Sequence, residues 1–542
     1  MVEGDLAEGA KYSRITGLIY IFNLIVGTGA LTLPAAFHDA GWALSSAVLI
    51  LLAFMSFLTA TFVIETMASA NALGRWRRLQ RLKRPGGRTG SNSENQYVDK
   101  NIQVEVLASD RVVSSPLHRG PVVISPSPIS SSPQGYPEQE EMDENHPLIE
   151  NVEQVLPTTS NYYDITEITE MGKMSSMFFN KTGSTLFYAC IAIYLYGDLA
   201  IYGAAVSKSV RDVACSYKPG NTSSPLNISE NEKCWEWKET SRLDVYRIIL
   251  AVFTCTIGQF VFCNVSKTKY LQIATSIMRW LAFIVMVVLA CMNLTKEGSD
   301  RPTPQPSIIS GVPNLFGVCV YSFMCHHSLP SLITPISQKQ NLFRLLLGDY
   351  LLILCFYFLL AFTGVFAFRE INDLYTLNFQ PSMSDNWFMF ALHFFLSLFP
   401  VFTLSTNFPI IALTLSNNLK SLFLSEHRSH NWFTRTVLFP LLALIPPTCV
   451  AMTTNSLEFL VGITGSYAGA GIQYIVPAAL VYYARKESRR ALGVGVKNNH
   501  MSPFKSVYWV LFVQLWAATC IIFVTWNHIS DLRERISLFL QS

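Results

Sequence analysis

Apolar residues fill eleven long runs of the chain, each with at most one Asp, Glu, Lys or Arg. Runs of this length can cross a bilayer as helices. The pattern predicts an all-α polytopic membrane protein with about 11 transmembrane helices. The predicted spans are Thr16–Phe37, Trp42–Ala70, Thr182–Ser207, Tyr246–Asn264, Ile273–Leu294, Ile308–Ser331, Asp349–Phe368, Trp387–Leu415, Thr436–Met452, Phe459–Tyr483 and Val507–Asn527.

Composition supports this prediction, since 50% of the 542 residues are hydrophobic and 14% are charged. A soluble protein of this size is less apolar, so the lipid bilayer is the expected environment. No basic patch of the kind that binds nucleic acid is present. The first apolar run is too long for a cleavable signal peptide, and its flank, Lys11 and Arg14, suits a cytosolic N-terminus.

Basic residues lie in alternate loops, which predicts the orientation. The segment after span 2 is strongly basic from Arg75 to Arg84, and the loops after spans 4, 6, 8 and 10 also carry Lys and Arg. Positive charge marks the cytosolic side. Residues 1–15 are therefore predicted to be cytosolic, spans 1 and 2 to occupy 16–73, spans 3 to 11 to occupy 182–527, and 528–542 to form a lumenal or extracellular tail.

Residues 74–181 are predicted to form a disordered cytosolic insert, because they are rich in Ser, Pro, Asn and acidic residues. Within the insert, Glu144 precedes Leu148 and Ile149 by the spacing of an acidic dileucine sorting signal. The motif predicts sorting adaptors as partners and a lysosomal or endosomal membrane as the location, with the plasma membrane as the alternative.

The loop 208–245 is predicted to be lumenal, and its chemistry agrees with that side. It contains two glycosylation sequons, at Asn221 and Asn227, and two cysteines, Cys215 and Cys234, for which we predict a disulfide. The sequon at Asn293 lies too close to the membrane for efficient use.

The first span contains an unusual stretch, Gly27-Thr28-Gly29, followed by Pro34. Inside a helix Gly costs about 1 kcal/mol against Ala, and Pro about 3. A helix broken within the membrane exposes backbone groups that must face protein or water. The stretch is either a kink for close helix packing or a break that lines a binding site.

Span 6 also departs from a plain apolar helix, with Tyr321, Ser322, Phe323 and His326 before Pro330. Spans 1 and 6 would open two successive five-span units. Interrupted helices at corresponding positions of two halves point to a transporter with an inverted repeat. We therefore expect a five-plus-five inverted repeat with discontinuous helices 1 and 6.

Three segments resemble the amino acid/auxin permease family of the amino acid/polyamine/organocation superfamily. They are the first span, the stretch Tyr321–His326, and the Gly-rich tenth span ending at Pro477. More narrowly, the opening stretch, the end of span 2 and the long insert resemble one orphan branch of that family. The resemblance implies the five-plus-five fold and the transport of amino acids.

The predicted substrate site lies at the two breaks. Free N–H groups at Gly27, Thr28, Gly29 and Ala30, at the positive end of a half-helix, would hold a carboxylate. Carbonyls near Tyr321, Ser322 and Phe323 would accept from the ammonium group, and the two aromatic rings would wall the pocket. Aromatic residues in membrane spans are more often simply packing residues.

Two coupling ions are considered. Asn23 with the span 8 hydroxyls of Thr403, Ser405 and Thr406 would suit sodium, by analogy with sodium-coupled relatives. Asp198 in span 3, or His326, would suit a proton, since a buried ionisable group in a membrane is a functional hypothesis by default. Asp198 is otherwise a structural partner of a neighbouring tyrosine. Glu65 and Arg279 are interpreted as residues near the cytosolic ends of spans 2 and 5.

The sequence contains no Walker A loop, potassium-channel filter or HExxH or GxSxG motif. We therefore predict a non-enzymatic secondary active transporter (a symporter) of small neutral amino acids, with no cofactor beyond the coupling H⁺ or Na⁺. The alternative is a sensor or membrane scaffold that acts through its cytosolic insert without net transport.

Overall fold

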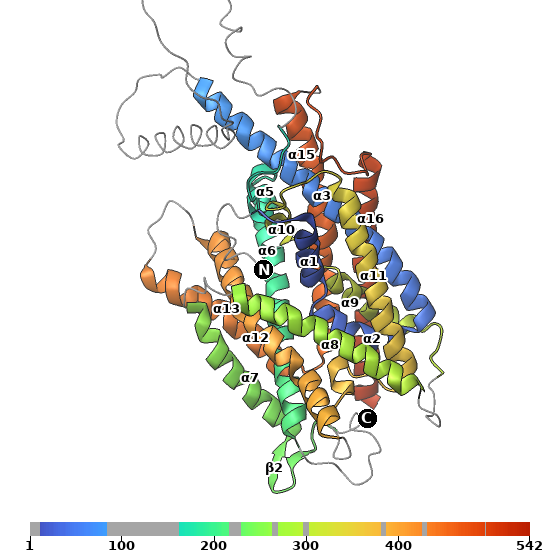
Figure 1. Ribbon diagram of the computed structural model, residues 1–542. Coiled ribbons are helices and arrows are strands. Elements are labelled where there is room, and N and C mark those ends of the chain that lie inside the picture. The colour runs from blue at the N-terminus through green and yellow to red at the C-terminus, as the bar shows by residue number, and fades with distance from the viewer. Residues whose placement is uncertain are drawn as a thin grey trace, which may run out of the picture. The chain divides into compact units, whose positions relative to one another are not determined.

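The computed structural model describes residues 11–83, 162–215, 229–262, 269–295, 303–380, 386–424, 431–493 and 495–541, which are mostly helical (Figure 1). By its contacts the chain forms two units. One consists of Met1–Arg75 with Tyr162–Ser542, and the other is Trp76–Asn161, of which only the end of helix α3 is described.

Nine of the described helical segments are long and apolar enough to cross a membrane, and the bent pair α1 (Arg14–Ile25) and α2 (Thr28–Ala40) makes up to ten. The other membrane-crossing elements are α3 (Trp42–Lys83), α6 (Lys181–Ala214), α7 (Arg242–Gly258) with η3 (Gln259–Phe262), α8 (Lys269–Thr295), α11 (Leu342–Ala367), α12 (Trp387–Phe423), α13 (Phe439–Thr453) preceded by the π-helix η6 (Thr434–Leu438), α14 (Leu457–Thr464) continuing through the π-helices η7 (Gly465–Gly469) and η8 (Gly471–Ile475) into α15 (Val476–Leu492), and α16 (Val507–Gln541). Shorter elements are α5 (Met171–Phe178), β1 (Lys233–Trp235), β2 (Lys238–Ser241), η4 (Ile309–Gly311), α9 (Val312–Ser322), α10 (Leu329–Ile333) and η5 (Tyr375–Asn378).

These helices confirm the predicted all-α polytopic class. The predicted spans fall largely on described helices, span 4 as far as Phe262, and span 6 is divided between α9 and α10. The count of eleven and the inverted repeat stay predictions. The C-terminal boundary differs from the prediction, because α16 continues to Gln541 where a tail was expected from residue 528.

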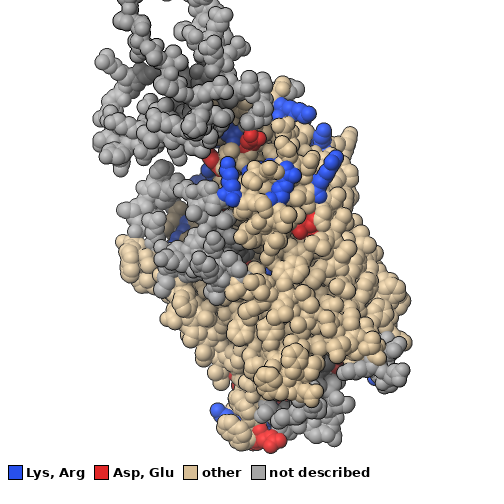
Figure 2. All heavy atoms as spheres, viewed as in Figure 1, with Lys and Arg blue, Asp and Glu red and all other residues tan. Residues whose placement is uncertain are grey.

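Helix packing centres on α6 and α9. Helix α6 lies against α7, α12, α13 and α14, while α9 lies against α2, α14 and η7. Glycine permits the closest of these crossings, since a Cβ on Gly317 of α9 would lie 1.9 Å from the Gly462 carbonyl oxygen. On the face in Figure 2, many Lys and Arg side chains gather at the upper end, and a broad band without charge lies below them. This distribution is typical of a membrane protein.

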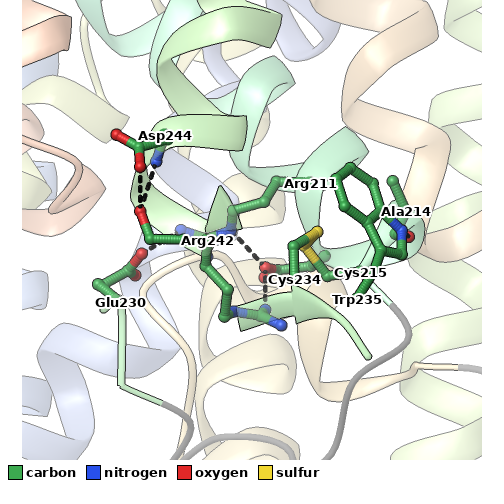
Figure 3. Close-up of a disulfide and its surroundings, with 10 residues drawn as sticks. Arg211, Ala214, Cys215, Glu230, Cys234, Trp235, Arg242 and Asp244 are labelled. Carbon is green, nitrogen blue, oxygen red and sulfur yellow. Dashed lines mark hydrogen bonds and ion pairs between the residues drawn. A yellow bond between two sulfur atoms is a disulfide. The ribbon is translucent and has the colours of Figure 1, made fainter. Parts of the chain in front are cut away.

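The predicted disulfide between Cys215 and Cys234 is confirmed, with the two Cα atoms 4.5 Å apart. It joins the end of α6 to the antiparallel hairpin of β1 and β2 (Figure 3). Beside it Arg211 donates to Asp212 and Glu230, and Arg242 also donates to Asp212 at 2.7 Å. The sequons at Asn221 and Asn227 lie outside the described residues.

The predicted disordered insert, residues 74–181, overlaps described structure at both ends, and at its N-terminal end α3 continues to Lys83. Residues Tyr162–Glu170, here called the strap, are described as an ordered segment, and α5 follows directly. The Asn71 amide donates to the Glu167 carbonyl at 3.1 Å, and its side-chain oxygen accepts from the Glu167 N–H at 2.9 Å. Arg75 donates to the carbonyls of Tyr162 and Asp164. The sorting residues Glu144, Leu148 and Ile149 lie outside the described part of the chain.

Candidate substrate site

The two predicted helix breaks are present. Helix α1 ends at Ile25 and α2 begins at Thr28 with a bend of 53° between their axes. Helix α9 ends at Ser322 and α10 begins at Leu329. The first break therefore lies at Val26 and Gly27, slightly before the predicted Gly27-Thr28-Gly29. The second begins at Phe323, the last residue of the predicted stretch.

The glycines of the first break have different surroundings. A Cβ added to Gly29 would lie 2.5 Å from the Ser322 hydroxyl oxygen and 2.6 Å from its Cα, so only glycine allows α2 and α9 to cross here. A Cβ on Gly27 would meet nothing nearer than the Leu24 carbonyl oxygen, at 4.0 Å. Gly29 thus serves packing, whereas open space lies beside Gly27.

The N-terminus of α2 faces this break. The first N–H groups of a helix, here those of Thr28 and Gly29, have no partner within the helix, and they carry the positive end of its dipole. The Thr28 side chain is 4% exposed, and its hydroxyl has no hydrogen-bond partner among the described residues. Ala30 is fully buried. Of the four N–H groups predicted to be free, that of Gly27 donates to the Ile25 carbonyl at 2.9 Å and that of Ala30 to the Gly27 carbonyl at 3.2 Å. The N–H groups of Thr28 and Gly29 remain for an anionic group, and a carboxylate site here stays a prediction.

The carbonyl ends of both broken helices are already engaged. Arg279 on α8 donates to the carbonyls of Asn23 and Val26, with the second bond at 3.1 Å. The Tyr357 hydroxyl on α11 lies 3.1 Å from the Ile25 carbonyl and 2.7 Å from the Ser322 carbonyl. Arg279 therefore pairs with the negative end of the α1 dipole, and the single Tyr357 hydroxyl proton can serve either the α1 or the α9 end.

Phe323 and His326 belong to the packing around the second break. The Phe323 ring is stacked on Tyr350 of α11 at 6.1 Å, and its carbonyl accepts from Ser56 at 3.2 Å. The His326 Nε2 lies 2.9 Å from the Thr59 hydroxyl on α3. Both side chains are fully buried, in contact with neighbouring helices.

Asp198 and Tyr321 meet across α6 and α9. The Tyr321 hydroxyl donates to the Asp198 carboxylate, and Asp198 is only 3% exposed. The Tyr194 ring lies 6.2 Å from Tyr321 and 5.5 Å from His327. The hydroxyl of Ser322 instead donates to Val318 in its own helix, at 2.7 Å. Asp198 thus has the tyrosine partner that the sequence offered as a structural role.

The span 8 hydroxyls are engaged within α12. Thr403 donates to the Phe399 carbonyl at 3.1 Å, and Thr406 donates to the Thr403 carbonyl at 2.9 Å. Ser405 is partly buried, and none of the described hydrogen bonds joins these three residues to Asn23. The Asn23 side-chain oxygen is buried without a described hydrogen-bond partner.

Sequence reasoning missed two residues of the site and misplaced a third. Arg279 contacts the first break and is not an end-of-helix residue, although a lone arginine in an apolar span was a signal for this. Tyr357, and Tyr202 on α6 beside Asp198, gave no signal, because tyrosines are common in membrane spans. Glu65 is 1% exposed and pairs with Arg485 at 2.7 Å.

A described cavity of about 280 Å³ lies elsewhere, at the opposite end of α2 from the break. It is lined by His38, Thr303, Pro304, Gln305, Ile308 and Arg369.

The chain belongs to the family described as transmembrane amino acid transporter protein, whose model matches residues 10–78 and 151–525. It is therefore a multi-pass membrane protein of a transporter family. Within the family, the orphan branch indicated by the opening stretch is that of transmembrane protein 104. The human protein of that name is 49% identical over 531 residues, covering 97% of this chain and 98% of its own. The Drosophila melanogaster homologue is 44% identical, covering 95% and 97%.

Among solved structures, a mutant of a manganese transporter from Eremococcus coleocola aligns over 98% of both chains. The TM-score is 0.39 and the sequence identity is 10%.

Proposed function

We propose that this chain is a secondary active transporter of small neutral amino acids that works by alternating access and is coupled to a proton gradient. The main support for this proposal is the first break. There, open space beside Gly27 adjoins the N-terminus of α2, which has no side-chain cap. Membership in an amino acid transporter family supports this class of substrate.

Coupling to a proton is favoured over coupling to sodium by Arg279. Its guanidinium already donates to the Asn23 and Val26 carbonyls, at the end of α1 where the sequence suggested a sodium ligand. A second cation placed about 4 Å away would be repelled by roughly 4 kcal/mol at an effective dielectric constant of about 20. Asp198 remains as a buried acid beside the second break.

Reconstitution of the purified full chain in liposomes tests the proposal. Uptake of radiolabelled glycine, alanine, serine and proline is measured under an imposed pH gradient, and separately under a sodium gradient. A pH gradient is expected to drive accumulation of at least one of them, and a sodium gradient is expected to drive none. Accumulation that requires sodium would refute the coupling, and no exchange of any of them would refute the function.

The position of the site is tested by Gly27→Val. The surrounding space accepts the side chain, so the variant should fold, yet the side chain would fill the break. Uptake is expected to fall at least tenfold with unchanged expression. Wild-type uptake by this variant would exclude the break as the substrate site.

The alternative of a sensor or scaffold is tested by deletion of residues 86–160, which leaves the strap intact. A transporter keeps its flux in liposomes without these residues, whereas a scaffold loses its partners. We further propose a cytosolic N-terminus and a lysosomal or endosomal location. Replacement of Leu148 and Ile149 by alanine should move the protein to the plasma membrane.

A further inference from the structure

Asp198 and Asp349 are buried carboxylates for which the described chain shows no cationic partner, in contrast to two other carboxylates. Glu65 is paired with Arg485, and Asp373 is paired with Lys208. The hydrogen bond described for Asp198 comes from the neutral Tyr321 hydroxyl. A carboxylate that is 3% exposed and uncompensated loses several kcal/mol of solvation free energy. The site around Asp198 therefore lacks one positive charge.

The groups around Asp198 are neutral. Those that interact with it are Tyr194 and Tyr202 on its own helix and Tyr321 on α9, with His327 next to Tyr194. Both ring nitrogens of His327 are buried without a described hydrogen-bond partner. Arg279 interacts with Tyr202, but its guanidinium donates to the α1 carbonyls. Helices α12, α13 and α14 also pack on α6, and no charged group described on them is recorded as acting on Asp198.

The backbone oxygens at the breaks are poorly placed to supply an ammonium site. The carbonyls of Asn23, Val26 and Phe323 accept from Arg279 and Ser56. Those of Ile25 and Ser322 both face the Tyr357 hydroxyl. An ammonium group that entered the site would share each of these carbonyls with a side chain, whereas the Asp198 carboxylate brings a full negative charge.

We infer that Asp198 is the counter-charge for the ammonium group of the amino acid, while the N-terminus of α2 holds the carboxylate. This inference rests on the proposed function and names the group that selects its substrate. Tyr202 lies one helical turn after Asp198 on α6 and close to Thr28, so α6 passes from Asp198 toward the N-terminus of α2. A free α-amino acid carries an ammonium group and a carboxylate on the same α-carbon. These two charges match the Asp198 carboxylate and the N-terminus of α2.

A consequence concerns protons. One buried carboxylate cannot be neutralised by a proton and by an ammonium ion at once, so protons and amino acid compete for Asp198. Acidification should therefore raise the half-saturating amino acid concentration, by up to tenfold per pH unit once Asp198 is protonated in the empty site.

The test is counterflow of radiolabelled alanine in liposomes containing the full chain, with equal pH on both sides so that no gradient is needed. Asp198→Asn is expected to reduce exchange at least 100-fold, and Asp198→Glu to restore part of it. Propionate, which lacks the ammonium group, should not compete. If Asp198→Asn keeps wild-type exchange and loses only gradient-driven uptake, the residue carries a proton alone and the inference is wrong.

Asp349→Asn is the matched control. Asp349 is also 3% exposed and lies in a membrane helix, but on α11 near Tyr350 and Cys325. It should keep exchange within twofold of wild type, and equal losses in both variants would contradict a specific role for Asp198.

A second measurement separates this inference from the proposed function. Thermal unfolding of the purified protein is followed in ethylammonium chloride and in sodium chloride of equal ionic strength. Ethylammonium should raise the midpoint of the wild type and not that of Asp198→Asn. If no amino acid is exchanged, the proposed function fails and this comparison still decides the ammonium site. Equal midpoints for wild type and variant in ethylammonium, or no stabilisation of either, would overturn it.

Discussion

At the scale of single residues, Arg279 stabilises the first helix break. Its guanidinium replaces the missing helical partners of the Asn23 and Val26 carbonyls. A hydrogen bond from a charged donor contributes about 1.5–3 kcal/mol, and a buried carbonyl left unpaired costs roughly a further 1–3. The orientation of α1 relative to α2 therefore depends on one side chain from another helix.

Replacing Arg279 with methionine is expected to lower the unfolding midpoint by several degrees and to abolish exchange, because both carbonyls lose their donor. Arg279→Lys should recover part of the stability through one bond. Arg247→Met is the control, since Arg247 donates to a single exposed carbonyl, that of Met452, at 3.4 Å. Thermal unfolding and counterflow measure the two effects. If Arg279→Met changes neither the unfolding midpoint nor the exchange rate, these hydrogen bonds are not needed.

Gly29 and Gly27 permit a paired test of packing. Gly29→Ala places a methyl group 2.6 Å from the Ser322 Cα, where backbone would have to move. Overpacking of this kind costs about 1–3 kcal/mol. Gly27→Ala, with open space at that position, should change the unfolding midpoint by less than a degree. Similar midpoints for the two variants would contradict the close crossing of α2 and α9.

Lys339, outside the membrane spans, allows a pH prediction. Burial, and then repulsion by Lys11, lower its pKa from 10.5 to about 8, while Asp164 opposes the shift. Between these two values the unfolded chain binds the proton and the folded chain does not, so stability rises with pH. The stability of wild type relative to Lys339→Met should therefore increase from pH 8 to pH 10, by roughly 1 kcal/mol after screening. Thermal unfolding of both proteins from pH 8 to pH 10 measures this difference in stability. A difference that does not change with pH would contradict the lowered pKa of Lys339.

At the scale of elements, the apolar runs predicted the helices because each must bury its backbone hydrogen bonds in the bilayer. Gly27 and Pro330 located the two breaks closely, since both residue types disrupt a helix. The capping of those breaks could not be predicted. Nothing in the sequence around Arg279 or Tyr357 says which carbonyl, hundreds of residues away in the chain, each side chain reaches.

The strap was missed for a related reason. Its composition resembles the insert that precedes it, and its order depends on Asn71 and Arg75 in a distant helix. Ile165 and Thr169 are 1% and 2% exposed because these anchors hold the strap backbone in place. Composition reports the average behaviour of a segment and not such specific partners.

The disulfide hairpin is an element whose contribution can be removed alone. Cys215 and Cys234 are separated by 19 positions in the sequence, and a loop of about this length is stabilised by roughly 3 kcal/mol in the chain-entropy model. Replacing both cysteines by serine should lower the unfolding midpoint, and reductant should have no further effect on that variant. Cys449→Ser, an exposed free cysteine, is the control and should leave the midpoint unchanged.

At the scale of the whole molecule, the described contacts close the predicted cytosolic end around both broken helices. Tyr12, just before α1, exchanges backbone hydrogen bonds with Pro335 and Ser337, just after α10, at 3.1 and 3.0 Å. Arg14 adds a bond to the Gln338 carbonyl at 3.0 Å. Under the alternating access proposed above, the two half-helices would separate from their surroundings, and these bonds would break in each cycle.

The strap links the segment after α10 to helix α3. Its Asp164 interacts with Lys339 and His500, while Asn71 and Arg75 attach it to α3. Asn71→Ala removes the side-chain oxygen that accepts from the Thr166 and Glu167 N–H groups, and each lost hydrogen bond costs about 0.5–1.5 kcal/mol. Amide hydrogen exchange in residues 162–170 should then accelerate at least tenfold, while α5 stays protected. Arg77→Ala, at an exposed position further along α3, should leave exchange unchanged. If the strap also opposes the proposed opening, alanine counterflow by Asn71→Ala should rise. A strap that exchanges faster without any change in counterflow would show that it stabilises the fold but does not limit transport.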